Sequence, residues 1–133
     1  LATLHTNDAP SAVTRLLDMG VEPFLLSSSL LGVLAQRLVR KLCPHCKKRD
    51  ERGRWHPVGC AECGMSGYKG RTGVYELMVA DAKVQALIHS RAAESQLFVA
   101  AEEAGMHSMR EDGERLVQEG ITSLEEVLRV TRE

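Results

Sequence analysis

The chain has 133 residues, enough for one modest domain or two very small ones. Its 17 Lys and Arg against 18 Asp and Glu leave a formal net charge of −1, which excludes a strongly basic nucleic-acid-binding domain. Hydrophobic residues make up 44%, which fits a packed core and argues against disorder. No apolar run reaches the roughly 20 residues of a membrane span. No signal peptide pattern is present, and the start at Leu1 without Met predicts a piece of a longer protein.

The opening residues predict a strand followed by a helix. Leu1–Leu4 is short, apolar and followed by a polar turn, as the end of a buried strand is. Asp8 is suited to cap a helix, and Pro10 fits the first turn because its missing N–H is not needed there. Gly20 is a typical stop, so we expect a helix between Asp8 and Gly20.

Two strands are expected on either side of an irregular middle. A second helix from Pro23 to about Leu34 is apolar on most sides and should be buried. Residues Gln36–Leu42 then allow a short strand. The stretch 43–70 is rich in Gly, Cys and charge and lacks periodicity, whereas Thr72–Val79 is typical of a strand that can pair with the one before Cys43.

The remainder of the chain is predicted to be helical. Asp81 can cap a helix with an apolar stripe, and a second stripe that includes Leu97 ends at Gly105. Ser108 and Ser123 are each followed three residues later by Glu, the spacing of a capping box. We therefore expect two more helices to start at these serines.

All four cysteines lie in two Cys-x-x-Cys pairs, Cys43 with Cys46 and Cys60 with Cys63. Two such pairs can present four thiolates to one tetrahedral ion, and the 13 residues between them can close the loop. Four thiolate ligands leave no position for water, so the zinc ion expected here is structural. Its role is to hold a loop that has too few apolar residues to fold unaided.

Other uses of the four thiols compete with zinc binding. Disulfides need an oxidising compartment, and nothing in the sequence indicates export. An iron–sulfur cluster is chemically open, and so is a redox-active Cys-x-x-Cys, although two neighbouring pairs make that less economical. His45 and His56 can in principle replace a thiolate, but four cysteines already complete a tetrahedral shell. The zinc content per chain separates these alternatives, since a redox protein contains none.

Positive charge is concentrated around the first cysteine pair. Residues 37–54 include eight Lys and Arg against two acidic residues, whereas acidic residues dominate beyond residue 102. A charge run is usually a solvated face. The functional alternative is a basic loop that faces anionic lipid, a partner protein or nucleic acid. Nucleic acid is the weakest of the three, because only Trp55 and Tyr68 are near to stack on bases.

A histidine follows the expected first strand. His5 lies between that strand and the helix capped by Asp8, and ligands of open α/β sheets collect at the carboxyl ends of strands. A helix N-terminus there also favours phosphate. A lone histidine is more often a hydrogen-bonded structural residue, and Thr6 and Asn7 can be simple turn residues. Both interpretations stay open on these residues alone.

Four segments, in order along the chain, resemble the bacterial secretion ATPases. Residues 1–9 (LATLHTNDA) resemble the histidine box of that family, and residues 35–46 (AQRLVRKLCPHC) resemble the segment that enters its tetracysteine motif. Residues 67–77 (GYKGRTGVYEL) resemble the segment that leaves the motif, and residues 120–127 (GITSLEEV) the C-terminal end. Within the family the chain looks most like the E-component ATPases of type II secretion. The type IV pilus assembly ATPases are the competing assignment.

The resemblance implies a hexameric ATPase in the cytoplasm, peripheral on the inner membrane and docked on secretion platform proteins. Turnover of ATP with Mg²⁺ would drive pseudopilus assembly and so protein export. The histidine box of the family lies near the terminal phosphate of the nucleotide, which makes His5 the candidate catalytic residue. The zinc ligands implied by the tetracysteine motif are Cys43, Cys46, Cys60 and Cys63.

The chain lacks a GxxxxGK[ST] phosphate-binding loop. Phosphoryl transfer is mostly positioning and charge stabilisation by the lysine of that loop and by Mg²⁺. We therefore predict that these 133 residues alone do not hydrolyse ATP.

The expected fold class is α+β in three parts. Residues 1–42 are predicted to end a RecA-like ATPase core, residues 43–70 to form an inserted tetracysteine zinc-binding subdomain, and residues 71–133 to form a strand and a C-terminal helical subdomain. Two other classes of function stay open. Salt-dependent binding of DNA or RNA would favour a zinc-ribbon module for nucleic acid, and a reactive thiol of low pKa would favour a redox protein.

Overall fold

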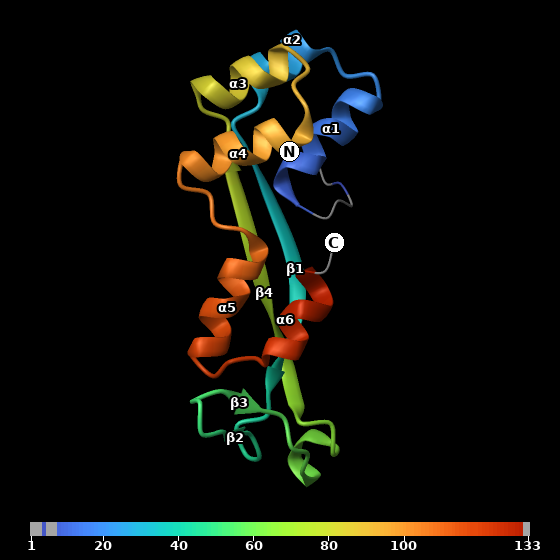
Figure 1. Cartoon of the computed structure of the whole chain (residues 1–133). Coiled ribbons are helices and arrows are strands. Elements are labelled where there is room, and N and C mark those ends of the chain that lie inside the picture. The colour runs from blue at the N-terminus through green and yellow to red at the C-terminus, as the bar shows by residue number, and fades with distance from the viewer. Residues whose placement is uncertain (1–3, 5–7, 132–133) are drawn as a thin grey trace. The chain divides into compact units, whose positions relative to one another are not determined.

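The structure is a computed structural model that describes residue 4 and residues 8–131. Its two long strands, β1 (Gly32–Leu42) and β4 (Tyr68–Val79), pair with each other (Figure 1). The chain forms two compact units. One consists of Leu1–Ala35 and Glu76–Ser108, and the other of Gln36–Tyr75 and Met109–Glu133. The predicted pairing of the strands on either side of residues 43–70, the cysteine loop, is confirmed. The three-part division remains a prediction.

Four helices belong to the first unit: α1 (Ala9–Asp18), α2 (Pro23–Ser29), α3 (Ala82–His89) and α4 (Glu94–Glu103). Asp8 caps α1, since its carboxylate accepts the Ser11 N–H at 2.8 Å. Asp81 caps α3 in the same way, accepting the Val84 N–H at 2.9 Å. Both predicted caps are therefore confirmed. Helices of this unit share a buried core of small and aliphatic side chains, with Val13, Val84, Ile88 and Leu97 almost fully enclosed.

The second helix is shorter than the sequence predicts. It ends at Ser29, and Leu30 is already extended. The carbonyl of Leu31 accepts the Ala80 N–H at 3.0 Å, and β1 begins at Gly32, four residues earlier than expected. The expected helix to Leu34 is thus wrong, because pairing with the end of β4 satisfies the backbone there.

Helices α5 (Met109–Gln118) and α6 (Leu124–Thr131) belong to the second unit and start where the two capping-box serines predict. Ser123 Oγ accepts the Glu126 N–H at 3.2 Å, one half of the predicted box. The Glu126 carboxylate does not follow the box pattern, because it accepts the backbone N–H of Arg40 in β1 at 2.7 Å. This contact ties α6 to β1.

Gly113 is the point where α5 approaches α6 most closely, and Gly113→Ala should destabilise the protein. An alanine methyl there would overlap Val127 Cγ1 and lie 2.9 Å from Cγ2. The usual gain of about 1 kcal/mol from replacing a helical glycine by alanine is smaller than an overpacking cost of about 1–3 kcal/mol. Thermal unfolding should therefore show a lower melting temperature for this variant.

A matched control removes the obstacle to the new methyl. In a Val127→Ala background, Gly113→Ala should cost less than it does alone, because the space left by the valine can accept the methyl. A melting temperature that rises on Gly113→Ala alone would contradict this packing.

Candidate metal centre

The structure brings the four cysteines together. Cys43 and Cys46 follow the end of β1. Cys60 precedes the short 3₁₀ helix η1 (Ala61–Cys63), and Cys63 is its last residue. Their four Sγ atoms all lie within 4.8 Å of one another. The Cys43–Cys60, Cys46–Cys63 and Cys60–Cys63 sulfur pairs are each 3.8 Å apart, and all four cysteines are free thiols.

This spacing fits a tetrahedral ion of the size of zinc. Four sulfurs that each lie about 2.3 Å from a central zinc are about 3.8 Å from one another. Three sulfur pairs of the cluster have that separation. The donor set is all thiolate, which suits zinc and leaves no ligand position for water. The four residues can therefore hold a structural zinc ion, and their assignment as its ligands remains a prediction.

Backbone N–H groups point at two of the sulfurs. Cys63 Sγ accepts from the Cys60 N–H at 3.3 Å and from the Gly67 N–H at 3.2 Å, and Cys46 Sγ accepts from the Gly59 N–H at 3.3 Å. Burial raises the pKa of Cys60 to about 11. Burial also acts to raise the pKa of Cys63, but the donors aimed at its sulfur outweigh that effect and lower the pKa to about 6. Such N–H donors stabilise sulfur in its thiolate form, the form that binds metal.

Gly67 occupies a position where a side chain would be strained and would clash with its neighbours. Its φ of +83° lies in the left-handed region, and a Cβ there would be 2.5 Å from Pro57 Cβ and 3.1 Å from the Val58 nitrogen. From this position its N–H reaches Cys63 Sγ, and its carbonyl accepts the Cys43 N–H at 2.9 Å. The glycine therefore connects the two halves of the cluster.

The loop between the cysteine pairs contains a small hairpin that the sequence did not predict. Strands β2 (Lys48–Arg49) and β3 (Trp55–His56) pair in antiparallel fashion. Asp50 organises the turn, because one carboxylate oxygen accepts the N–H groups of Arg52 and Arg54, each at 2.9 Å. Its other oxygen lies 2.6 Å from His56 Nε2, and these hydrogen bonds lower the pKa of Asp50 to about 2.

The two histidines considered as substitute ligands do not join the cluster. His56 is engaged by Asp50, and His45 is exposed. Among the described residues, the only group able to share one ion consists of the four cysteines. The sequence-based choice of the cysteines over the histidines is consistent with this geometry.

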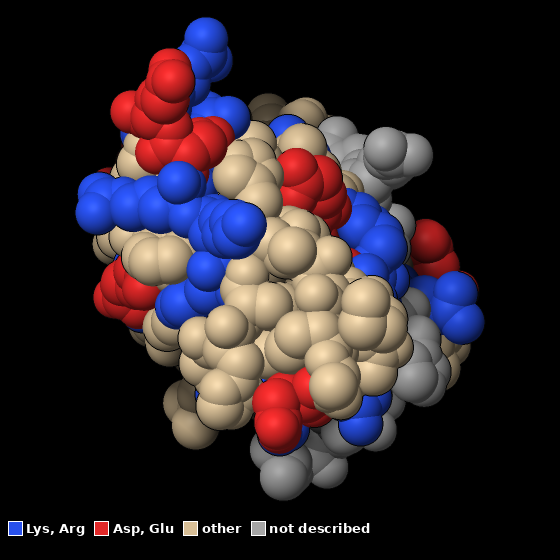
Figure 2. Space-filling model, turned by 90° about the horizontal axis from the view of Figure 1, so that it is seen from below, with Lys and Arg blue, Asp and Glu red and all other residues tan. Residues whose placement is uncertain are grey.

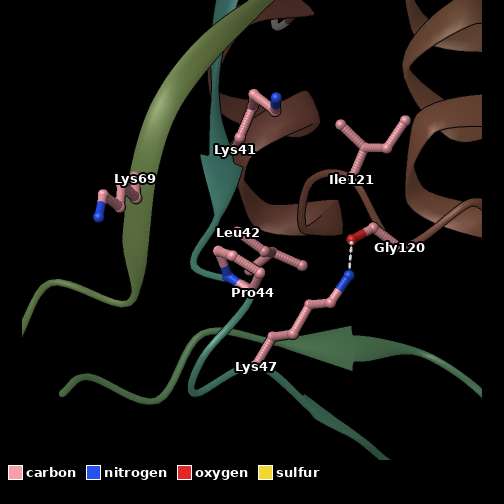
Figure 3. A pocket seen from close by; sticks show the side chains of 7 residues that line it. All are labelled: Lys41, Leu42, Pro44, Lys47, Lys69, Gly120 and Ile121. Carbon is pink, nitrogen blue, oxygen red and sulfur yellow. Dashed lines mark hydrogen bonds between the residues drawn. The ribbon is translucent and has the colours of Figure 1, made fainter. Parts of the chain in front are cut away.

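The base of the loop is attached to the turn between α5 and α6. Lys47 Nζ donates to the Gly120 carbonyl at 2.8 Å (Figure 3). The same Nζ lies 4.7 Å from the centre of the Trp55 ring. The Leu42 N–H donates to the Ile121 carbonyl at 2.8 Å. A hollow of about 300 Å³ lies beside this junction, lined by Lys41, Leu42, Pro44, Lys47, Lys69, Gly120 and Ile121.

Glu126 is the centre of a second connection in the same unit. It is 2% exposed and receives the Arg40 N–H, the Arg40 guanidinium at 2.9 Å and the Arg129 guanidinium at 2.9 and 3.0 Å. Arg40 also lies 4.2 Å from the centre of the Tyr68 ring, whose hydroxyl is 2.7 Å from Ser123 Oγ. Sequence reasoning missed this role, because the capping-box spacing assigned Glu126 to its own helix.

His5, the candidate catalytic residue, lies outside the described residues. The nearest part of the chain that the structure describes in detail is the start of α1. There Glu76 on β4 accepts the Ala9 N–H at 2.7 Å. Sequence reasoning assigned Glu76 no role.

The described helices include none with both the length and the apolar character that crossing a membrane requires.

Comparison with solved structures identifies a similar fold in the pilus retraction motor PilT with bound ADP. That structure matches 98% of this chain and 32% of its own, with a TM-score of 0.66 and 21% sequence identity. This likeness concerns the fold alone, and it supports the predicted α+β class.

Sequence comparisons give closer relatives. The chain is 64% identical over its whole length to the type II secretion system protein HxcR of Pseudomonas aeruginosa, of which it covers 28%. It is 51% identical to the type II secretion system ATPase E of Vibrio cholerae, covering 29% of that protein. It is 49% identical to the type IV pilus assembly ATPase TfpB of Acinetobacter baylyi, with 98% of this chain and 25% of that protein aligned.

The chain thus spans between a quarter and a third of the length of these relatives. The model of the family described as type II/IV secretion system protein matches residues 1–129, nearly the whole chain. The chain belongs to the type II/IV secretion system protein family.

Proposed function

We propose that the chain is the C-terminal, zinc-binding portion of a hexameric secretion ATPase that drives pseudopilus assembly and protein export by type II secretion. The observation that carries this proposal is the 64% identity to HxcR over all 133 residues. Because the chain covers 28% of that relative, the phosphate-binding loop and the ligands of Mg²⁺ are assigned to the remainder of a longer protein. The fold of the chain is then the end of a RecA-like core with an inserted tetracysteine subdomain.

A type IV pilus assembly ATPase is the second candidate. TfpB supports it at 49% identity, which is lower than the identity to HxcR. Deletion of the gene separates the two. Loss of exported proteins from the culture medium with surface pili retained would support the secretion assignment, whereas loss of pili with normal export would support the pilus assignment.

Zinc in this proposal has a structural role. The four thiolates hold the ion, and the ion holds residues 43–70 against the turn between α5 and α6 through the Lys47 and Leu42 contacts. Two alternatives from other classes of function remain, a nucleic-acid-binding module and a redox protein. Salt-dependent DNA binding, or metal-free protein with a reversible disulfide, would favour those alternatives.

His5→Ala in the full-length protein should lower kcat for ATP hydrolysis by about 10²-fold or more. The reason is that a histidine positioned at the terminal phosphate can orient water or move a proton. Phosphate release measured at saturating ATP and Mg²⁺ checks this, with His45→Ala as the control. His45 is exposed and outside the cysteine cluster, so that variant should keep wild-type kcat.

Two results would contradict this assignment. One is unchanged turnover in His5→Ala, which would remove His5 from the catalytic site. The other is ATP hydrolysis by residues 1–133 alone, because this segment contains no phosphate-binding loop.

The proposed location is the cytoplasmic face of the inner membrane, with anionic phospholipid and platform proteins as partners. On the face of the molecule seen from below, the largest group of Lys and Arg side chains, with Asp and Glu among them, lies toward one edge beside a broad uncharged area (Figure 2). The cysteine loop itself exposes Val58 and Met65 by 52% and 70%. Basic residues next to exposed apolar ones are typical of a surface that binds anionic membranes.

Replacing both Lys41 and Lys69 by Glu should weaken binding of the full-length protein to anionic vesicles. Both lysines line the hollow beside the cysteine loop, and each basic residue near an anionic surface contributes about 1 kcal/mol. Co-sedimentation with phosphatidylglycerol vesicles at about 0.1 M salt should show at least a tenfold loss of vesicle binding for this double variant. The control Arg15→Glu, on α1, should lose less binding. Equal binding to anionic and neutral vesicles would discard the lipid partner.

A further inference from the structure

Glu76 is a buried carboxylate that takes no part in the metal centre. It lies on β4 between Val74 and Met78, both fully buried, and is itself only 3% exposed. Acidic side chains are almost never fully buried unless they are paired. Its Oε2 accepts the backbone N–H of Ala9 at 2.7 Å, a contact that joins residues 67 positions apart in the sequence.

That N–H belongs to the first turn of α1, where the helix has no backbone acceptor of its own to offer. Asp8 serves the Ser11 N–H, and Pro10 has no N–H. Ala9 and Pro10 are fully buried, so water cannot take the place of a protein acceptor for the Ala9 N–H. The carboxylate is also favoured by the positive end of the helix dipole.

Glu76 therefore attaches the start of α1 to β4. Ala9 follows His5 by four residues, so whatever fixes Ala9 also fixes the end of the segment that leads back to His5. A displacement of about 1 Å at a reacting group can cost about 10² in rate.

We propose that Glu76 is a positioning residue that holds the start of α1, which follows His5 in the sequence, in its working place. This inference rests on the proposed function, in which His5 acts at the terminal phosphate of ATP. Glu76 touches neither nucleotide nor metal in this proposal, and it acts on His5 through the start of α1.

The test uses the full-length protein and two readouts, hydrogen exchange of the peptide spanning residues 4–12 and the kinetics of ATP hydrolysis. Glu76→Ala should speed exchange in that peptide at least tenfold and lower kcat about tenfold, with KM for ATP changed less than threefold. Glu76→Gln keeps an acceptor oxygen of the same reach and should restore both readouts. Glu126→Ala is the matched control, because Glu126 is also buried and accepts a backbone N–H at 2.7 Å. It should leave exchange of residues 4–12 unchanged.

A second comparison shows whether Glu76→Ala lowers kcat through lost positioning or through a general loss of stability. In a His5→Ala background, Glu76→Ala should lower kcat no further, because the group it positions is gone. An equal fold-loss of kcat in both backgrounds, or unchanged exchange in Glu76→Ala, would overturn the proposal. Wild-type kcat in His5→Ala alone would instead contradict the proposed role of His5, and the exchange data would still decide whether Glu76 anchors the start of α1.

Discussion

Removal of zinc by a strong chelator should unfold residues 43–70 while the helices of the first unit keep their protection from hydrogen exchange. The loop has little apolar material to hold it, since Val58 and Met65 are largely exposed. Metal binding supplies the folding free energy of such a loop, so removing the ion takes away what holds the four sulfurs together. Exchange of the Gly59, Cys60 and Gly67 amides, which donate to sulfur, should accelerate most.

Cys63→Ser is the substitution that tests this dependence most sharply. Its sulfur accepts two backbone N–H groups and lies 3.8 Å from both Cys46 Sγ and Cys60 Sγ. Serine is a poor zinc ligand, so retained zinc should fall at least tenfold in competition with a chromogenic chelator. His45→Ala is the matched control and should retain zinc. Full zinc retention by Cys63→Ser would show that the cluster does not hold the ion.

Glu126→Ala should lower the free energy of unfolding by about 3 kcal/mol, the largest effect expected from a single change outside the cysteines. The substitution removes the acceptor of the Arg40 N–H. It also removes the carboxylate with which the guanidinium groups of Arg40 and Arg129 both pair. Urea unfolding of the zinc-loaded protein checks the magnitude. The neighbouring Glu125 is exposed, so Glu125→Ala should change stability by less than about 0.5 kcal/mol.

Ionisation of Glu126 should also make the free energy of unfolding depend on pH. Burial would raise the pKa of Glu126, but hydrogen bonds from Arg129 and Arg40 outweigh burial and hold the pKa at about 2, below the ordinary 4.5. Because the folded-state pKa is the lower one, this stabilisation is complete above about pH 4.5 and is lost as pH falls toward 2. The loss amounts to about 3 kcal/mol at the low end.

Glu126→Gln is the control for that pH dependence. It keeps an acceptor for the Arg40 N–H but cannot ionise, so its stability should vary less between pH 5 and pH 2.5 than that of the wild type. Identical pH profiles for the two proteins would show that Glu126 does not ionise with a lowered pKa.

The elements that were predicted well are those whose signals are local. The caps at Asp8 and Asp81 accept N–H groups three residues away, and their sequence positions alone are sufficient to predict them. The same holds for the cysteine pairs, because the x-x spacing within each pair already places two thiols on one turn.

The elements that were missed depend on contacts between distant residues. Helix α2 ends early because Leu31 pairs with Ala80, 49 positions away in the sequence, and no periodicity reports such a pairing. Glu76 and Glu126 are similar cases. Each is an acidic residue in a segment with an ordinary pattern, and its partner, Ala9 or Arg40, is supplied by a remote element. Alternation along β4 could have flagged Glu76, because it falls on the buried face between Val74 and Met78.

The metal content of the full-length protein, determined by elemental analysis and zinc-edge X-ray absorption, tests the central claim most directly. We expect one zinc ion per chain, surrounded by four sulfur atoms at about 2.3 Å. Reduced protein prepared without chelator that contains no stoichiometric zinc, or zinc bound by nitrogen and oxygen instead of sulfur, would contradict it.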